Sequence, residues 1–295
     1  MSQSTDLKIK TLKSSIFKIT SHHTGGERAK QDLALSVFLK FSLGVMLNQL
    51  VARYRHYGIT DLELAEHIFI DDTHFGLDRK LFDTLNPEAL ATSVRLYKEL
   101  VEALPAYSDV LMSVIEEMYL ADKNGEGLGQ YLTPPDIAYL IDELIEASES
   151  VLAQPRNKPY GVQDDCSGAG SLTLPRAKRE AAKGRQCIRM LDVKVNDIDP
   201  LMCCAAALQF VTSIVVHEQD LHQLQVTCSN ALTETKPHSK SVVVIKTPEK
   251  LFSRVSEAND EKFQNTINLY GNFNKLTEKV LNKQNTGGLS FKACI

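Results

Sequence analysis

Residues 162–172 read VQDDCSGAGSL, and they mark the point at which a predicted strand turns into a predicted helix. A short apolar run ends at Asp164, and Gly168 and Gly170 follow four and six positions later. Residues 177–183 then have a helical pattern. A strand that runs through a glycine turn into a helix lets the backbone approach a ligand closely. Taken alone, the same pattern is equally typical of an ordinary loop.

A second segment, residues 190–200, reads MLDVKVNDIDP and predicts the next strand over residues 190–195. Asp197 lies 27 residues after Gly170, near the spacing at which an acidic residue reaches both hydroxyls of a ribose. Asp199 and Pro200 suit the cap and first turn of the helix that follows. The alternative is that Asp197 is only a solvated strand end. The glycine turn upstream favours the ribose interpretation.

A third segment, residues 129–135, reads GQYLTPP and comes before a helix predicted over residues 136–150. Tyr131 and the two prolines would make a stiff surface, and Thr133 offers a hydroxyl group close to the start of that helix. A simple turn before a helix explains this segment equally well in isolation.

The chain as a whole predicts an α/β fold preceded by helices. Short apolar runs at residues 160–163, 190–195, 211–216, 225–228 and 241–245 alternate with helical stretches, which is typical of a parallel sheet with crossover helices. Ligands of such sheets bind at the carboxyl ends of the strands. We expect a mobile polar arm over residues 1–28, a helical domain over 29–122, a Rossmann-like domain over 123–255 and a C-terminal helix or tail over 256–295.

Together the three segments resemble the adenine-specific (N6) DNA methyltransferases, above all the modification subunit of type I restriction systems. Residues 129–134 match the family's G-Q-[FY]-[FYL]-T-P segment, and residues 197–200 match its [DE]-[ILV]-[DN]-P. Residues 164–170 keep the aspartate and both glycines of D-P-x-C-G-[ST]-G but lack its proline. The resemblance spans roughly residues 100–250 and implies a class I, Rossmann-like fold that binds S-adenosylmethionine.

The resemblance also implies a role for each matching position. One group of residues would contact the methionine part of the cofactor, and a second group would form the glycine turn around the cofactor. Asp197 would hold the ribose, and Asn230 would lie near the adenine. The first two groups are Gln130, Tyr131 and Thr133 at the methionine end, and Asp164, Gly168 and Gly170 in the turn. Asn230 stands where the family has an acidic residue, and its carbonyl oxygen could still accept from an adenine amino group.

The acceptor motif departs from the family. There a strand ends in N-P-P-[FY], whose asparagine and aromatic ring hold a flipped adenine. Here residues 246–250 read KTPEK, so Thr247 and Pro248 stand at the catalytic positions without the amide or the ring. About 45 residues follow Pro248, which we judge too few for the target-recognition regions that this family carries or borrows. We therefore expect DNA contact through the helical domain or through a specificity or defence subunit in a hetero-oligomer.

Three functional hypotheses follow. The first is an S-adenosylmethionine-dependent methyltransferase acting on adenine in DNA, or on another acceptor, in a divergent pocket around Asn230, Thr247 and Pro248. The second is a catalytically inactive pseudo-methyltransferase that serves as a regulatory or structural subunit of a modification, restriction or defence assembly. The third, a dinucleotide-dependent oxidoreductase, shares the glycine turn and the acid but does not explain residues 129–134.

Composition sets outer limits on function. A formal net charge of -4 argues against a protein that coats nucleic acid by bulk charge. The most apolar stretch, residues 33–50, is interrupted by Lys40 and Asn48, so we expect a buried helix and no membrane partner. The six cysteines form no C-x-x-C pair and the first residues resemble no signal peptide, which predicts reduced thiols, no metal site and a cytoplasmic location.

Overall fold

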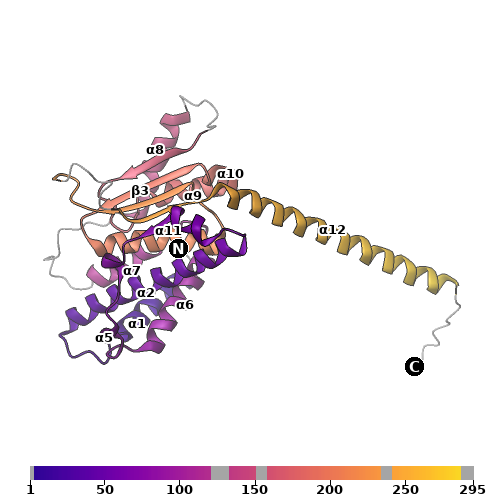
Figure 1. The fold of residues 1–295 in the computed structure, drawn as a ribbon. Helices are drawn as coiled ribbons and strands as arrows, with labels where there is room; N and C mark the ends of the chain where they lie inside the picture. The colour runs from indigo at the N-terminus through magenta and orange to yellow at the C-terminus, as the bar shows by residue number, and fades with distance from the viewer. Residues whose placement is uncertain (1–2, 121–132, 151–157, 234–240, 287–295) are drawn as a thin grey trace, which may run out of the picture. The chain divides into compact units, whose positions relative to one another are not determined.

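The computed structural model describes residues 3–120, 133–150, 158–233 and 241–286, in two compact units, residues 1–247 and 248–295 (Figure 1). The first unit contains eleven of the described helices and all five strands. Its helices are α1 (Gln3–Lys18), α2 (Glu27–His56), α3 (Asp61–His67), α4 (Asp72–Phe75), α5 (Arg79–Phe82), α6 (Pro87–Glu102), α7 (Leu111–Leu120), α8 (Pro135–Ser150), α9 (Leu174–Lys183), α10 (Arg185–Ile188) and α11 (Pro200–His217). Its strands are β1 (Ile68–Ile70), β2 (Tyr160–Asp164), β3 (Leu191–Asp197), β4 (Gln223–Cys228) and β5 (Ser241–Lys246).

The five strands form one mixed sheet in the order β1-β5-β4-β3-β2. Strands β2, β3 and β4 are parallel, with Val162 opposite Val193 and Val195 opposite Val226. Strand β5 is antiparallel to β4, and β1 is antiparallel to β5. The prediction of a parallel sheet therefore holds for three strands and is wrong for β5.

The parallel part of the sheet is one βαβαβ unit. The chain runs from β2 through α9 and α10 to β3, and then through α11 to β4. A doubly wound Rossmann fold contains two such units, which meet at a switch point where the strand order reverses. Among the described residues no strand pairs with the outer edge of β2, so this sheet has one unit and no switch point.

Helix α11 extends through residues 211–216, which the sequence predicts as a strand. The β-branched residues Val211, Ile214 and Val215 favour a strand in isolation, but local propensity is weak against tertiary packing. Most of the helix is buried, because it packs against β3 and β4 on one side and against α2 on the other. The Thr212 hydroxyl donates to the Leu208 carbonyl one turn earlier (2.6 Å), which satisfies it within the helix.

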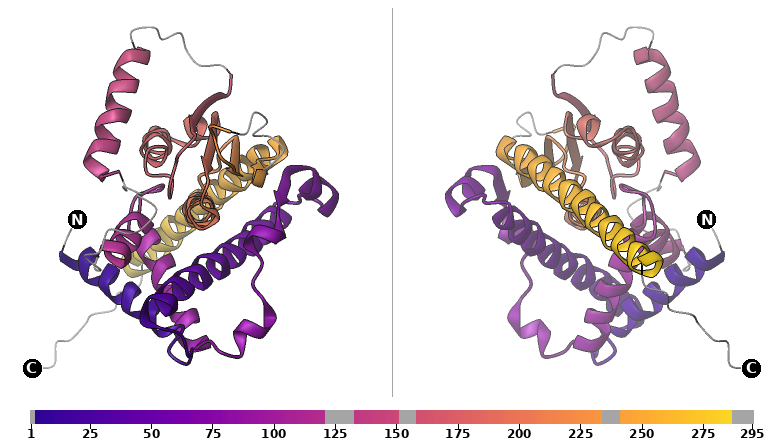
Figure 2. Two further views of the ribbon diagram at one scale, coloured as in Figure 1. Left: turned by 90° about the vertical axis from the view of Figure 1, so that its left-hand side faces the viewer. Right: turned by 90° about the vertical axis from the view of Figure 1, so that its right-hand side faces the viewer.

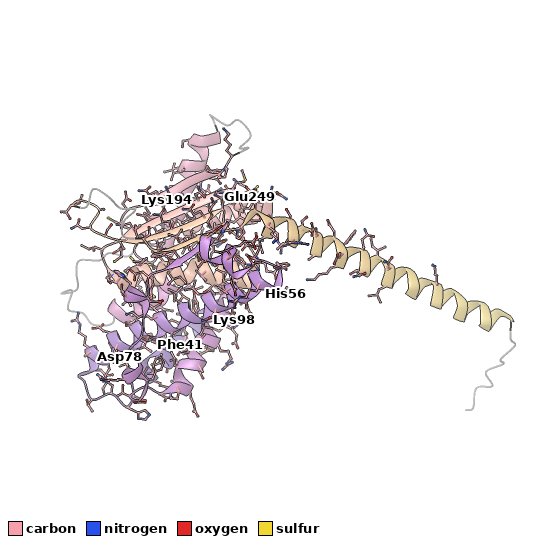
Figure 3. The ribbon with its side chains drawn as sticks, in the orientation of Figure 1. Phe41, His56, Asp78, Lys98, Lys194 and Glu249 are labelled. Carbon is pink, nitrogen blue, oxygen red and sulfur yellow. The ribbon has the colours of Figure 1, made fainter. Side chains whose placement is uncertain are left out.

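The helical part of the first unit forms further layers behind α11 on one side of the sheet (Figure 2). Helix α2 buries Phe38, Leu39 and Met46 and packs against α11, α1 and α6. In Figure 3, Phe41 lies in this helical part and Lys194 on the sheet. Because α2 and α11 share one core, the predicted boundary near residue 122 does not separate two compact units. Strand β1 also lies inside the segment predicted to be all-helical, where it pairs with β5.

Residues 3–28 differ from the mobile arm that the sequence predicts over residues 1–28. Residues 3–18 form α1, and its side chains Ile9, Leu12 and Ile16 are buried. Their spacing of three and four residues places them on one face of a helix, which packs against α6 and α2. The polar residues between them obscured this stripe in the sequence.

Two helices, α2 and α11, are long and apolar enough to span a membrane by length and composition. Their apolar windows are 56% and 72% buried, and the two helices pack against each other. Their apolar side chains therefore pack in the core of the first unit. For residues 33–50 this is the buried helix that the sequence predicts.

The second unit consists, in its described part, of one helix, α12 (Glu249–Thr286). Figure 3 labels Glu249 at its first turn. The helix begins before the predicted boundary at residue 256, directly after Pro248.

Candidate functional site

The carboxyl ends of β2, β3 and β4 bring together the sequence-predicted residues of the cofactor turn. Asp164 is the last residue of β2, Asp197 is the last of β3, and Asn230 follows β4 by two residues. The glycine turn, residues 165–173, connects β2 to α9. The register places Asp197 opposite Cys228, so these ends lie at one edge of the sheet.

The two glycines of the turn have different roles. Gly168 has a φ of +52°, and a Cβ at this position would meet no heavy atom within 4 Å, so the space above the turn is open. Gly170 has a φ of +95°, and a Cβ there would lie 3.3 Å from Phe210 Cε2. Gly170 thus lets the turn approach α11 closely, while Gly168 leaves room over the backbone.

Asp197 fastens the turn to β3. Its Oδ2 accepts from the Gly168 backbone N–H (2.8 Å), and its Oδ1 accepts from the Asp199 N–H (2.9 Å). A carboxylate has about four lone-pair sites, so each oxygen can still accept from a ligand hydroxyl. The Asp199 side chain caps α11 by accepting from the Leu201 N–H (2.8 Å), as the sequence predicts.

One carboxylate oxygen of Asp164 is buried and accepts no hydrogen bond. Its Oδ1 accepts from the Cys166 N–H (3.1 Å), whereas its Oδ2 is buried without a hydrogen-bond partner. Burial raises the pKa of this carboxyl group, and the neighbouring charges of Asp165 and Asp197 raise it further. A buried, partnerless acceptor at a strand end is a natural place for a ligand's donor group.

The raised pKa of Asp164 predicts a dependence of stability on pH. When the pKa of a carboxyl group is higher in the folded than in the unfolded state, its protonated form stabilises the fold. This stabilisation is fully present below the unfolded pKa and is lost as pH rises through the folded pKa. Near neutral pH the ionised group therefore destabilises the fold, and we expect Asp164→Asn to raise the Tm. The difference in Tm between Asp164→Asn and the wild type should shrink as pH falls below the ordinary pKa range of carboxyl groups. Thermal unfolding at several pH values measures this, with Asp32→Asn on the exposed side of α2 as the matched control. A lower Tm for Asp164→Asn at neutral pH would contradict the prediction.

Asn230 lies at the expected edge, but its carbonyl oxygen is already engaged. Its Oδ1 accepts from the backbone N–H groups of Leu232 (3.0 Å) and Thr233 (3.3 Å) and so shapes a local turn. The predicted contact with an adenine amino group would compete with this turn.

Asn196, which the sequence analysis did not single out, ties the strand ends together. Its Nδ2 donates to the carbonyl oxygens of Asp165 (2.9 Å) and Ser229 (3.0 Å). Its Oδ1 accepts from Thr227 Oγ1 (2.9 Å) and Ser229 Oγ (2.7 Å). The side chain is buried and makes four hydrogen bonds, which fixes the spacing of the three strand ends.

A second unpredicted network joins the glycine turn to the helical layer. Asp109, just before α7, accepts from Ser171 Oγ (2.6 Å) in the turn and from Gln209 Nε2 (2.9 Å) on α11. Gln209 Nε2 also donates to the Ala169 carbonyl (3.0 Å). Burial raises the pKa of the Asp109 carboxyl group. The one signal in the sequence was Gln209 itself, an amide within the otherwise apolar run of residues 201–211.

The predicted residues of the methionine end are only partly described. Gln130 and Tyr131 lie outside the described residues. Thr133 lies two residues before α8, and that helix packs against α9.

The predicted catalytic residues lie at the opposite end of the sheet. Because β5 is antiparallel, its last residue Lys246 pairs with Gln223, the first residue of β4. Thr247 then donates its backbone N–H to the His222 carbonyl (3.0 Å). The length of β4, about 17 Å at 3.3 Å per residue, separates this end from Asp197. Thr247 therefore does not share a pocket with Asn230, contrary to what the enzyme hypothesis expected. Pro248 is the first residue of the second unit.

The connection between β4 and β5 explains this error. Only twelve residues separate Cys228 from Ser241, close to the minimum for a crossover to a parallel strand. The chain instead returns antiparallel beside β4. Thr247 has a structural role there: its side chain is buried, its hydroxyl donates to the Leu221 carbonyl (2.5 Å), and Tyr54 Oη lies 3.4 Å away.

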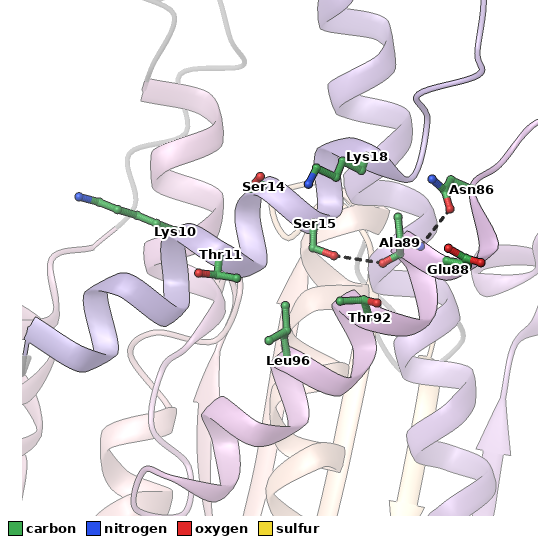
Figure 4. A pocket seen from close by; sticks show the side chains of 10 residues that line it. All are labelled: Lys10, Thr11, Ser14, Ser15, Lys18, Asn86, Glu88, Ala89, Thr92 and Leu96. Atoms are coloured by element: carbon green, nitrogen blue, oxygen red, sulfur yellow. Dashed lines mark hydrogen bonds between the residues drawn. The ribbon is translucent and has the colours of Figure 1, made fainter.

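A cavity of about 530 Å³ lies elsewhere, between α1 and α6 (Figure 4). Its walls carry hydroxyl groups and two lysines around one apolar side, and the Ser15 hydroxyl donates to the Ala89 carbonyl at its edge (3.2 Å). The lining residues are Lys10, Thr11, Ser14, Ser15, Lys18, Asn86, Glu88, Ala89, Thr92 and Leu96. None of the predicted site residues is among them.

Comparison with known proteins gives little further information. No protein-family model matches the chain, and no curated protein matches it. One similar solved structure is the methyltransferase subunit of a type I restriction-modification system from Streptococcus thermophilus, with 14% sequence identity and a TM-score of 0.37. The match covers 81% of this chain and 61% of that one, so the chain spans less than two thirds of that subunit. A TM-score this low carries no argument about fold or function.

Proposed function

We propose that this chain is a methyltransferase-like protein that binds S-adenosylmethionine and does not methylate adenine. Its role would be that of a regulatory or structural subunit of a DNA modification or defence assembly, with DNA reached through a partner subunit or the helical layer. The observation that carries the proposal is the separation of the two predicted sites. The cofactor residues Asp164, Gly168 and Asp197 share one edge of the sheet, and Thr247 lies at the other.

The residues at the glycine turn fit the nucleoside part of this cofactor. Asp197 retains free lone pairs for ribose hydroxyls, and Asp164 Oδ2 is an acceptor without a partner. The open space above Gly168 allows a ligand to approach the backbone. When bound, S-adenosylmethionine would supply an activated methyl group, and this chain's residues would bind and orient its adenosine.

The charge of the turn favours this cofactor over a dinucleotide. Residues 160–173 contain two aspartates and no lysine or arginine, and Asp197 and Asp199 stand beside them. A pyrophosphate would be repelled by these carboxylates, whereas S-adenosylmethionine carries no phosphate and offers amino and hydroxyl donors. We therefore set the oxidoreductase hypothesis below the other two.

The position of β5 supports the proposal that the chain does not methylate adenine. Direct transfer needs the acceptor within near-attack distance, about 3–3.5 Å, of the sulfonium methyl group. Thr247 cannot provide an acceptor pocket across the length of β4, and residues 246–250 contain no aromatic platform for a flipped base.

Radiolabelled S-adenosylmethionine tests this proposal directly. The purified chain is incubated with the labelled cofactor and with double-stranded DNA, single-stranded DNA or RNA. We expect no label on any of these above the level of a protein-free control. Label on DNA adenine that disappears in Asp197→Ala and persists in Asp32→Ala, which changes an exposed acid on α2, would overturn the proposal and restore the enzyme hypothesis.

A further inference from the structure

Helix α8 has an apolar stripe that faces away from the rest of the first unit. Five large aliphatic side chains recur at helical spacing and are between 37% and 62% exposed. They are Ile137, Leu140, Ile141, Leu144 and Ile145, and we call them the α8 stripe. Contiguous exposed apolar patches of this kind mark interaction sites on soluble proteins.

The opposite, acidic face of α8 is the one that packs inward. Asp142 is buried and accepts from Arg176 Nε (2.7 Å) and Arg179 Nε (2.6 Å) of α9. Glu146 accepts from Arg176 Nη1 (2.8 Å) and Lys183 Nζ (2.8 Å). Rotating the stripe inward would leave these charges unpaired, which is costly for buried groups. The stripe is thus held outward by ion pairs.

A second unpaired surface lies at the same end of the sheet. Strand β2 is the last strand in the sheet order, and Figures 1 and 2 show α8 at this end. The Tyr160 N–H donates to the Met190 carbonyl next to β3 (2.9 Å). Since successive N–H groups of a strand alternate in direction, those of Gly161 and Gln163 point away from β3. Both residues are exposed, and within the described part of the chain no strand pairs with this edge, which can therefore accept another strand.

We propose that a second copy of this chain covers both surfaces. A two-fold axis at this end would place β2 antiparallel to its symmetry mate and pack one α8 stripe against the other. The stripe supplies the apolar core, and the strand edge and flanks supply the remainder of the ~800 Å² per partner that a stable dimer buries. Three of the acidic residues of α8, Asp142, Glu143 and Glu146, are paired with arginine or lysine side chains of α9, which offsets their charge beside the stripe.

A membrane surface or an extended peptide fits the α8 stripe and the β2 edge less well than a second copy of the chain does. Helix α8 carries five acidic residues and no lysine or arginine, which disfavours an anionic membrane surface. An extended peptide could pair with the β2 edge but would leave the stripe uncovered. A second copy matches both surfaces at once, because it brings the same helix and the same strand edge.

Light scattering of the full chain across a range of concentrations tests the proposal. The wild-type protein is expected at twice its chain mass of 32.8 kDa at tens of micromolar, and Leu140→Glu/Leu144→Glu is expected to raise the dimer Kd about 100-fold. These positions are exposed, so circular dichroism and Tm should show a folded variant. The matched control is Leu62→Glu/Phe263→Glu, which adds equal charge at exposed apolar positions of α3 and α12 and should leave the dimer intact.

Three results would overturn the proposal. One is a wild-type monomer at all concentrations, which would leave the surface to a different protein. Another is a dimer that survives in the α8 variant or is lost in the control. The third concerns strand β2. Gln163→Pro removes an N–H group that points outward from β2 and should weaken the dimer. An unchanged dimer Kd in this variant would exclude pairing of the two β2 strands.

Discussion

Arg53→Met is expected to destabilise the fold by about 3–5 kcal/mol, because it leaves the buried Asp220 carboxylate without its cation. The Arg53 Nη1 and Nη2 atoms both donate to Asp220, and the side chains of the pair are only 10% and 6% exposed. Arg53 Nη1 also donates to the Ile214 carbonyl at the end of α11 (3.1 Å). The pair therefore links α2 to α11 and to the amino end of β4.

Urea unfolding measures this effect, with Arg55→Met as the matched control. Arg55 lies on the same helix two residues later and pairs with Asp61 (2.7 Å), but both side chains are more than half exposed. An exposed pair contributes less than about 1 kcal/mol. The double variant Arg53→Met/Asp220→Leu should recover much of the loss, since it removes both charges. Equal losses in Arg53→Met and Arg55→Met would contradict the prediction.

The Arg53 cluster also bears on the role of Thr247. Tyr54 Oη donates to Asp220 Oδ1 (3.1 Å) and lies beside the Thr247 hydroxyl. Burial raises the pKa of Tyr54 well above its ordinary value, and the charge of Asp220 adds to this. Thr247 thus belongs to a buried polar cluster that holds α2 against the sheet, which is a structural function.

Gln209→Leu is expected to cost about 4 kcal/mol, although leucine has nearly the same volume. Gln209 Oε1 accepts from the N–H groups of Val110 (2.9 Å) and Leu111 (3.1 Å) at the start of α7. Its Nε2 donates to Asp109 and to the Ala169 carbonyl in the glycine turn. The substitution leaves the buried N–H groups of Val110 and Leu111 and the Ala169 carbonyl without this partner, and each carries a desolvation penalty of about 1–3 kcal/mol before relaxation. Asp109 keeps its hydrogen bonds from Ser171 and from the Met112 N–H.

The free energy of unfolding in urea again provides the measurement. Exposed Gln49 on α2 offers a matched Gln→Leu substitution, which should change stability by less than about 0.5 kcal/mol. Limited proteolysis of Gln209→Leu should also show faster cleavage near the glycine turn, because the turn loses its tie to α11 and α7. A loss in Gln209→Leu no larger than in Gln49→Leu would contradict the prediction.

Local features of the fold could be predicted from the sequence. The strand ending at Asp164, the glycine turn that follows it and the Asp199 cap depend on neighbouring residues, and the structure has all three. Asp197 at the end of β3 follows from the same local pattern. What could not be predicted depends on contacts distant in sequence. The direction of β5 is set by how the chain returns after β4, and the strand propensity of residues 211–216 is overridden by burial between two layers.

The hydrogen-bond networks of Gln209 and Asn196 also could not be predicted, because they join residues distant in sequence. Gln209 bonds residues about 100 positions away, and Asn196 bonds residues more than 30 positions away on both sides. Neither pairing has a local signature, because polar residues inside apolar segments show that a partner is needed without showing which one. The acceptor site was misplaced for a related reason, since the motif order implied a parallel strand that the short connection does not form.

Calorimetric titration of the full chain with S-adenosylmethionine tests the central claim most directly, because it separates cofactor binding from methyl transfer. We predict saturable binding by the wild-type protein, a Kd at least about 10-fold weaker in Asp197→Ala, and an unchanged Kd in the control Asp32→Ala, which removes an exposed acid on α2. Thr247→Ser, which keeps the buried hydroxyl group at the far end of the sheet, should bind as the wild type does. No binding by a folded sample, or equal binding by Asp197→Ala, would contradict the assignment of the glycine turn as the cofactor site.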